Sequence, residues 1–191
     1  MKFGTLIALG VATFIGTARA EEKAPSWRDY PGVTNTSYVE PSGAKAVQLS
    51  ATVDATPQEA FDAFATEEGF KAWAVPFAKI DLRVGGDIEA SYDPNAAVGG
   101  PDNIKNRIDA YIPGRLLVLH NVQAPAALPG REAFAKTATI IEFKQVAEGK
   151  TEVTVTNIGY GDTPDDAAAY AHFEWGNAYT LDALAKHFAA N

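Results

Sequence analysis

Residues 163–189, TPDDAAAYAHFEWGNAYTLDALAKHFA, form the stretch that decides the fold. Thr163 and Pro164 provide an N-cap and a first helical residue, and no later proline interrupts the segment. A helix of this length measures about 39 Å and can cross a whole sheet. At about 100° per residue, one stripe of this helix carries Tyr170, Phe173, Asn177, Thr180, Leu181, Leu184 and Phe188. We therefore predict that this stripe faces a sheet.

The residues before this helix supply that sheet. Residues 45–53 alternate between apolar and polar side chains, as half-buried strands do. Capping residues at Thr56 and Thr66 then begin two short helices, from residue 57 and at about 67–73. Further strands are predicted at 79–83, 87–92, 104–112, 115–122, 138–145 and 151–158. The order predicts an α+β protein in which a bent antiparallel sheet of about seven strands wraps around the last helix.

The N-terminus has the pattern of an export signal. Lys2 precedes an apolar run over residues 3–15, and Ala18-Arg19-Ala20 resembles a signal-peptidase site. The run is shorter than the roughly 20 apolar residues of a membrane-spanning helix, so we expect cleavage and no stable membrane insertion. We therefore divide the chain into a signal peptide at 1–20, an arm or linker at 21–44 and one domain at 45–191.

Composition excludes several classes of function. Removal of residues 1–20 takes away two basic side chains and no acidic ones, which changes the net charge from −8 to −10. Nucleic acid is therefore not expected as a partner. The chain has no cysteine, and His120, His172 and His187 are not placed to share a metal ion. No sequence motif for a nucleophile, a zinc site or a nucleotide is present, so we expect neither metal nor cofactor.

The order and spacing of several motifs indicate a family. Phe61-x-x-Phe64, Phe70-x-x-Trp73, Pro76 and the run from Asp81 to Gly86 occur as they do in SRPBCC, or START-like, proteins. The segment from Ile108 to Leu116, which contains Tyr111-Ile112-Pro113-Gly114, and Gly149-x-Thr151-x-Val153 resemble the AHSA-like branch, named for the activator of heat-shock-protein ATPase. The resemblance, here to an exported bacterial type, implies a helix-grip fold like that of the birch-pollen allergen, with a pocket between the sheet and the last helix. Members commonly carry Gly-Trp in that helix, where this chain has Gly176-Asn177, so the resemblance implies no particular ligand.

Eight residues are candidates for the pocket: Trp73, Phe77, Tyr92, Asn106, His120, Phe173, Asn177 and Thr180. Asn177 and Thr180 lie among apolar neighbours and need hydrogen-bond partners, either in a strand, in a buried water or in a ligand. The aromatic candidates could stack on a ligand or pack in the core, and Asn106 could serve strand-end hydrogen bonding instead. The loops at 93–102 and 123–136 are surface linkers or entrance lids.

We therefore predict an exported protein that binds a small hydrophobic or amphipathic molecule. One alternative is a metal-independent cyclase or dehydratase, for which His120 is the acid–base candidate. A second alternative is an envelope protein that binds a partner. Activation of a cytosolic chaperone is disfavoured, because a signal peptide directs the chain away from the cytosol.

The arm has one further expected role. Trp175 points away from the stripe that faces the sheet, and an outward indole would be exposed without a cover. The arm offers Trp27, Tyr30 and Tyr38. We predict that residues 27–38 fold across the outer surface of the last helix and cover Trp175, with an exposed Trp175 at a partner contact as the alternative.

Overall fold

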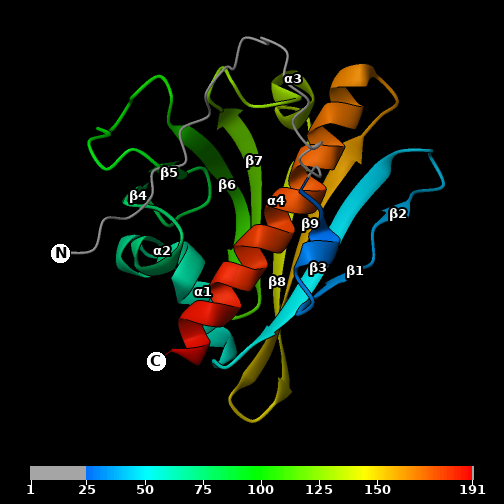
Figure 1. Cartoon of the computed structure of the whole chain (residues 1–191). Coiled ribbons are helices and arrows are strands. Elements are labelled where there is room, and N and C mark those ends of the chain that lie inside the picture. The colour runs from blue at the N-terminus through cyan, green and yellow to red at the C-terminus, as the bar shows by residue number, and fades with distance from the viewer. Residues whose placement is uncertain (1–24, 191) are drawn as a thin grey trace, which may run out of the picture.

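The computed structural model describes residues 25–190 as one curved sheet that holds one long helix (Figure 1). The elements, in chain order, are the 3-10 helix η1 (Trp27–Asp29), β1 (Val33–Asn35), β2 (Tyr38–Val39), β3 (Lys45–Val53), α1 (Pro57–Ala65), α2 (Glu67–Trp73), β4 (Phe77–Ile80), β5 (Asp87–Ser91), β6 (Ile104–Ile112), β7 (Leu116–Gln123), α3 (Arg131–Phe134), β8 (Ala138–Ala147), β9 (Lys150–Tyr160) and α4 (Pro164–Ala189). The predicted signal peptide lies outside the described residues.

The sheet is antiparallel throughout its described pairs. Its strands follow the order β1-β3-β9-β8-β7-β6-β5-β4, and β2 also pairs with β3. α4 crosses the face formed by β3, β9 and β8, while α1 and α2 lie beside its C-terminal end (Figure 1). The predicted α+β helix-grip architecture is confirmed.

Local signals explain where the helices begin. The Thr56 hydroxyl accepts a hydrogen bond from the Glu59 backbone nitrogen, and the Glu59 carboxylate accepts one in return from the Thr56 nitrogen at 2.8 Å. Thr163 and Asp166 form the same reciprocal pair at the start of α4. Each pair satisfies two backbone donors that the first turn of a helix leaves free.

The connection between β4 and β5 contains Gly85 and Gly86, and its backbone also forms hydrogen bonds with β6. Gly85 adopts a positive φ of 79°, and a Cβ on Gly86 would collide with the carbonyl oxygen of Asp81. The Gly85 nitrogen donates to the Ile108 carbonyl at 2.8 Å, and the Ile108 nitrogen donates to Gly86 at 2.9 Å. These two positions therefore require glycine for structural reasons.

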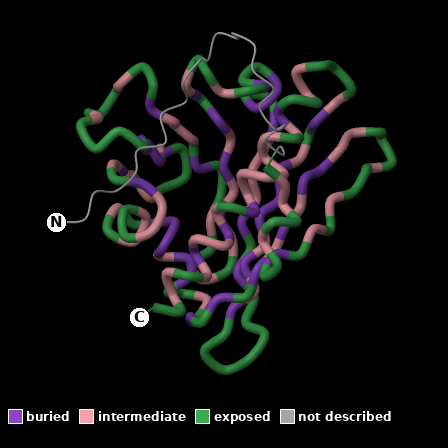
Figure 2. Tube along the Cα trace, in the orientation of Figure 1, coloured by how far each residue is buried: buried purple, intermediate pink, exposed green. Residues whose placement is uncertain are grey.

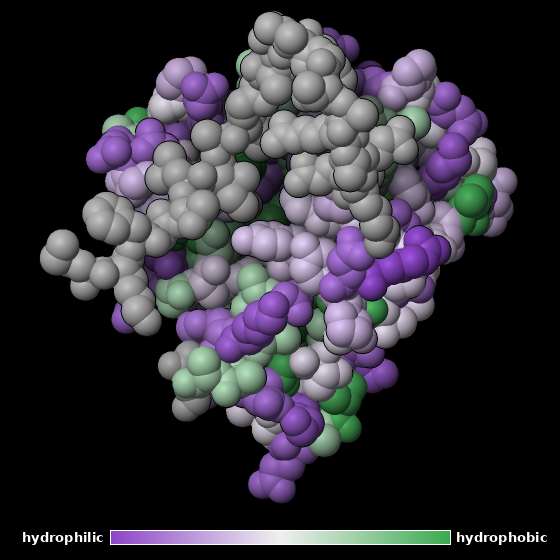
Figure 3. Space-filling view, in the orientation of Figure 1, coloured by the Kyte–Doolittle hydropathy of each residue, from purple (hydrophilic) through white to green (hydrophobic). Residues whose placement is uncertain are grey.

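The sheet has more strands than the sequence predicted, because part of the arm joins it. Val33–Asn35 and Tyr38–Val39 both pair with β3, and neither strand is long enough to show a period. Buried segments follow the strands, whereas the β8–β9 hairpin tip and the loop at 93–102 are mostly exposed (Figure 2). Hydrophilic residues occupy most of the rim of the visible face, and hydrophobic residues gather in its lower part (Figure 3).

The arm contacts α4 through η1 and β1, and the Asn35 Nδ2 donates to the Glu174 carboxylate at 2.9 Å. Trp27 and Tyr30 pack against the core, and the Tyr30 ring lies 6.3 Å from that of Tyr179. Tyr38, in contrast, is 44% exposed and lies on the sheet edge. The half-buried Trp175 contacts the rings of His172 and Tyr179, both on its own helix. The arm therefore contacts the helix from Trp27 to Asn35, whereas the prediction is wrong for Tyr38, and the ring contacts of Trp175 come from its own helix.

Candidate functional site

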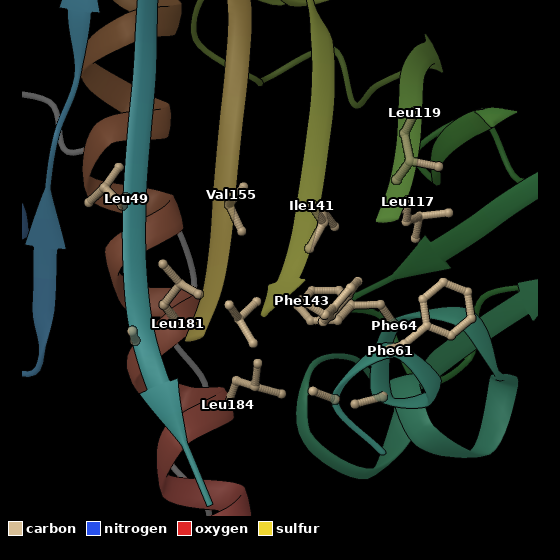
Figure 4. Close-up of a cluster of buried hydrophobic side chains, with 14 of the residues drawn as sticks. Leu49, Phe61, Phe64, Leu117, Leu119, Ile141, Phe143, Val155, Leu181 and Leu184 are labelled. Atoms are coloured by element: carbon tan, nitrogen blue, oxygen red, sulfur yellow. The ribbon is translucent and has the colours of Figure 1, made fainter. Parts of the chain in front are cut away.

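One half of the concave face is filled by apolar side chains. Leu49, Val155, Ile141 and Leu117 form one row across four neighbouring strands, because each is the cross-strand partner of the next. Two phenylalanines of α1 and two leucines of α4 pack against this row (Figure 4). All four are buried: Phe61, Phe64, Leu181 and Leu184. This half serves the stability of the fold and leaves no polar group for recognition.

The next row of the same face is polar at its centre. Cross-strand pairing places Val47, Asn157, Thr139, Leu119 and Ile108 side by side. Asn157 is only 1% exposed, and its Nδ2 donates to the Thr139 hydroxyl at 2.7 Å. Asn177 of α4 donates from Nδ2 to the Asn157 Oδ1 at 2.6 Å. The helix and the sheet are therefore joined by a chain of amide and hydroxyl groups.

A second amide pair lies on β6 and β7. Asn106 and Asn121 are cross-strand partners, and Asn121 is two residues from Leu119, so both side chains share the concave face. The Asn121 Nδ2 donates to the Asn106 Oδ1 at 3.0 Å and to the backbone oxygens of Gln123 and Lys105 at 2.9 and 3.2 Å. We call Asn106, Asn121, Thr139, Asn157 and Asn177 the amide site.

A pocket of about 620 Å³ opens beside the amide site. The end of β7, the following loop, α3 and the first turn of α4 line it, through Asn121, Val122, Gln123, Ala124, Ala126, Leu128, Gly130, Arg131, Glu132, Ala135 and Asp165. Asn121 belongs both to the pocket wall and to the amide site. The loop predicted as a possible lid therefore forms a wall of this pocket.

Two predicted site residues belong to the amide site and two others lie nearby on α4. Asn106 and Asn177 are these two members. Asn177 donates to Asn157 of β9, so it has the strand partner that was one of its predicted alternatives. Phe173 stacks on Phe134 of α3, with ring centres 4.2 Å apart. Thr180 donates to the Gly176 carbonyl of its own helix at 2.8 Å, which satisfies its hydroxyl without a ligand.

The remaining predicted residues lie elsewhere. The Trp73 indole nitrogen donates to the Ala63 carbonyl at 2.9 Å, and its ring packs on Phe64, so it joins α1 to α2. Phe77 is the partner of Ser91 and therefore lies on the outer face, opposite Ala78. Tyr92 lies beyond the end of β5 and is 69% exposed. The structure does not bring these residues to the amide site.

His120 also lies on the outer face. It is paired with Arg107, and its Nδ1 lies 2.8 Å from the Asp109 carboxylate. The residues that flank it on β7, Leu119 and Asn121, face the concave side instead. The acid–base candidate for an enzyme is therefore separated from the pocket by the sheet. Within residues 25–190, no group of three or more His, Asp or Glu side chains is arranged to hold a metal ion.

The pKa shifts in this region belong to residues outside the amide site. Burial lowers the pKa of His172, which lies on α4 against Phe173. On the outer face, burial alone would raise the pKa of Glu89, but hydrogen bonds from Asn103 and Gly99, with the nearby Lys105, lower it. That buried carboxylate anchors the loop at 93–102.

Sequence reasoning missed Asn121, Thr139 and Asn157 as members of one site. The register that brings Asn157 to Thr139 depends on pairing between β8 and β9, which no local pattern gives. On β7, residues 116–119 are apolar on both faces, so no period in the sequence marks Asn121 as facing inward.

The geometry defines a class: an antiparallel sheet that grips a C-terminal helix, with hydrogen-bonded side-chain amides between them. The family model of Activator of Hsp90 ATPase homolog 1-like protein matches residues 54–189, and the chain belongs to this family. The resemblance to the SRPBCC superfamily and its AHSA-like branch is confirmed at this level. No curated protein matches the chain.

Solved structures share the fold at low sequence identity. The Aha1 dimer from Colwellia psychrerythraea is 20% identical, with a TM-score of 0.53 over 73% of this chain and 96% of that one. Protein MLL2253 from Mesorhizobium loti is 16% identical, with a TM-score of 0.59 over 76% and 98%. PFC0360w, an HSP90 activator from Plasmodium falciparum, is 15% identical, with a TM-score of 0.51 over 73% and 90%. At these identities the likeness shows the fold alone.

Proposed function

We propose that the protein is exported and binds a small hydrophobic or amphipathic molecule between its sheet and α4. The observation that carries the proposal is the division of the concave face into a packed apolar half and an amide site beside a pocket of about 620 Å³. A few placed polar groups next to apolar walls are typical of small-molecule sites. The fold and the family are consistent with a binding role.

Native mass spectrometry of the freshly purified protein tests this proposal. We expect a bound small molecule that organic extraction releases and identifies. Thr139→Phe, which places a bulky ring in the amide site, should abolish the bound mass. Ile140→Phe, the neighbouring residue on the opposite face of β8, should retain it, provided that circular dichroism shows both variants folded. A wild-type protein that carries no molecule after gentle purification would overturn the proposal.

Export is a separate part of the proposal and has its own test. Its support is the charged, apolar and small-residue pattern at residues 1–20. The mass of the protein from an extracytoplasmic fraction should correspond to a chain that begins at Glu21. A full-length chain found only in the cytosol would refute export without affecting the binding proposal. No helix within residues 25–190 has the length and apolar character needed to span a membrane.

A partner-binding function is the second candidate, and the outer surface of α4 favours it. Tyr179 is 52% exposed there, beside the half-buried Trp175. One structural relative is named as an HSP90 activator. ATP hydrolysis by purified Hsp90, measured with and without this protein, distinguishes the candidates: the binding proposal predicts no change, whereas a stimulation that Trp175→Ala abolishes supports the partner function.

A further inference from the structure

The hydrogen bonds of the Asn106–Asn121 pair fix which of its amide atoms remain free. The Asn121 Nδ2 lies within hydrogen-bond distance of two backbone oxygens, which can only accept, so this atom must be the nitrogen. The atom of Asn106 that Asn121 approaches must then be an oxygen. This leaves the Asn121 Oδ1 as a free acceptor and the Asn106 Nδ2 as a free donor among the described contacts.

These free atoms are not sealed inside the protein. In the described part of the chain, the Tyr160 hydroxyl is the one fully buried side-chain polar atom without a partner. The free amide atoms of Asn106 and Asn121 must therefore face accessible space. Asn121 is itself only 5% exposed and lines the pocket, so its oxygen meets that space at the pocket wall.

Charged groups on β6 and β7 point away from the amide site. Arg107 pairs with Asp87 at 2.9 Å, Asp109 with His120 at 2.8 Å, and Lys105 with the outer-face Glu89 at 3.5 Å. The amide site itself consists of neutral side chains. An ionised head there would lose its water without gaining a counter-charge, which is costly in a partly buried site.

The pocket wall adds charges of both signs. Arg131 and Glu132 are exposed, and the Asp165 carboxylate accepts a hydrogen bond from the Ala133 nitrogen at 2.6 Å. One cation against two anions gives this wall no net attraction for an anionic ligand. The wall therefore supplies no counter-charge to an anionic head, and to a cationic head it offers only the solvent-exposed Glu132 and the Asp165 carboxylate, which is already bonded to the Ala133 nitrogen.

From this geometry we propose that the amide site selects an uncharged polar head that both donates and accepts a hydrogen bond, such as a hydroxyl or carboxamide, on an apolar body. Such a head accepts from the Asn106 Nδ2 and donates to the Asn121 Oδ1. A carboxylate can only accept and leaves Asn121 unmatched, whereas an ammonium can only donate and leaves Asn106 unmatched. Ala126, Leu128 and Ala135 of the pocket wall provide the adjoining apolar surface. This inference rests on the proposed function.

Displacement of the neutral fluorescent probe N-phenyl-1-naphthylamine from the purified protein tests the inference. The competitors are decanol, decanamide, decanoate and decylammonium, which share one chain length and differ in the head. We expect the two neutral compounds to displace the probe at concentrations about tenfold or more below those of the two ions, because an ionic head leaves one polar group unmatched.

A change of charge at the site provides the decisive variant. Asn106→Asp keeps the oxygen that accepts from Asn121 and replaces the free donor with a negative acceptor. The concentration of decylammonium that displaces the probe should fall by about tenfold relative to that of decanol. Asn95→Asp, the same substitution on the exposed loop at 93–102, should leave the preference unchanged.

The outcomes separate the inference from the proposed function. Decanoate that binds as tightly as decanol would overturn the neutral-head inference and leave a binding protein. If the protein prefers neutral heads but Asn106→Asp does not alter this preference, the assignment of the selectivity to the Asn106–Asn121 pair is wrong. A protein that binds neither the probe nor any competitor would overturn both the proposed function and the inference.

Discussion

Asn157→Leu is the substitution whose effect follows most closely from the structure. Leucine has the branched heavy-atom shape of asparagine but a larger volume, so overpacking at this 1% exposed position adds to the cost of the lost bonds. The change removes the bonds at 2.6 Å to Asn177 and at 2.7 Å to Thr139. Each net bond contributes about 1 kcal/mol, and the half-buried partners can regain part of this from water. We therefore expect the free energy of unfolding to fall by about 2 kcal/mol.

Urea denaturation followed by circular dichroism measures this loss. The midpoint should fall with an unchanged slope, since the surface exposed on unfolding stays the same. Because Asn157 and Asn177 share a bond, the double variant with Asn177→Leu should lose about 1 kcal/mol less than the sum of the single variants. Additive effects, or a variant as stable as the wild type, would refute the claim that these amides hold α4 to the sheet.

Three further predictions concern the surrounding structure. The interactions that lower the pKa of Glu89 stabilise the fold fully above the ordinary value of 4.5, and this stability is lost as the pH falls through the lower folded-state pKa; the hydrogen-exchange protection factors of the loop at 93–102 should therefore fall in acid, whereas those of Glu89→Gln should not fall further. Gly130→Ala should destabilise the protein by about 2–4 kcal/mol in thermal unfolding, because its φ is 66° and a Cβ would overlap Ala169, whereas Gly149→Ala, with the same φ and open space, should cost about 1 kcal/mol. Tyr160→Phe removes a buried hydroxyl that lies near Thr137 without forming a hydrogen bond of normal geometry, and it should raise the free energy of unfolding by about 1 kcal/mol; a loss of that size would show that the hydroxyl is bonded to Thr137.

Periodic and capping signals in the sequence were sufficient for the long elements of the fold. The predicted bounds of 45–53 and 104–112 agree with β3 and β6, and the helix that follows Thr163 ends where predicted. β1, β2 and α3 were missed because each has four residues or fewer, which is too short for a period to appear. Their structure depends on pairing with β3 or on packing against α4.

The site was only partly predictable, because it depends on which face of a strand each residue occupies. His120 lies in the run Leu116 to Val122, where apolar side chains are nearly continuous and do not mark the inner face. Phe77 was placed before its strand, whereas β4 begins at that residue and turns it outward. Asn121 meets Asn106 through a register with a bulge that no local pattern indicates.

Side-chain amide signals in nitrogen–proton correlation spectra test the central claim that the amide site beside α4 is the binding site. Titration of the isotope-labelled protein with decanol should shift the signals of Asn106, Asn121, Asn157 and Asn177 together, with saturation at a common affinity. The amide of Asn95, on the exposed loop, should stay in place. Shifts confined to the outer surface of α4, or signals of the four asparagines that do not move at saturating decanol, would contradict the claim.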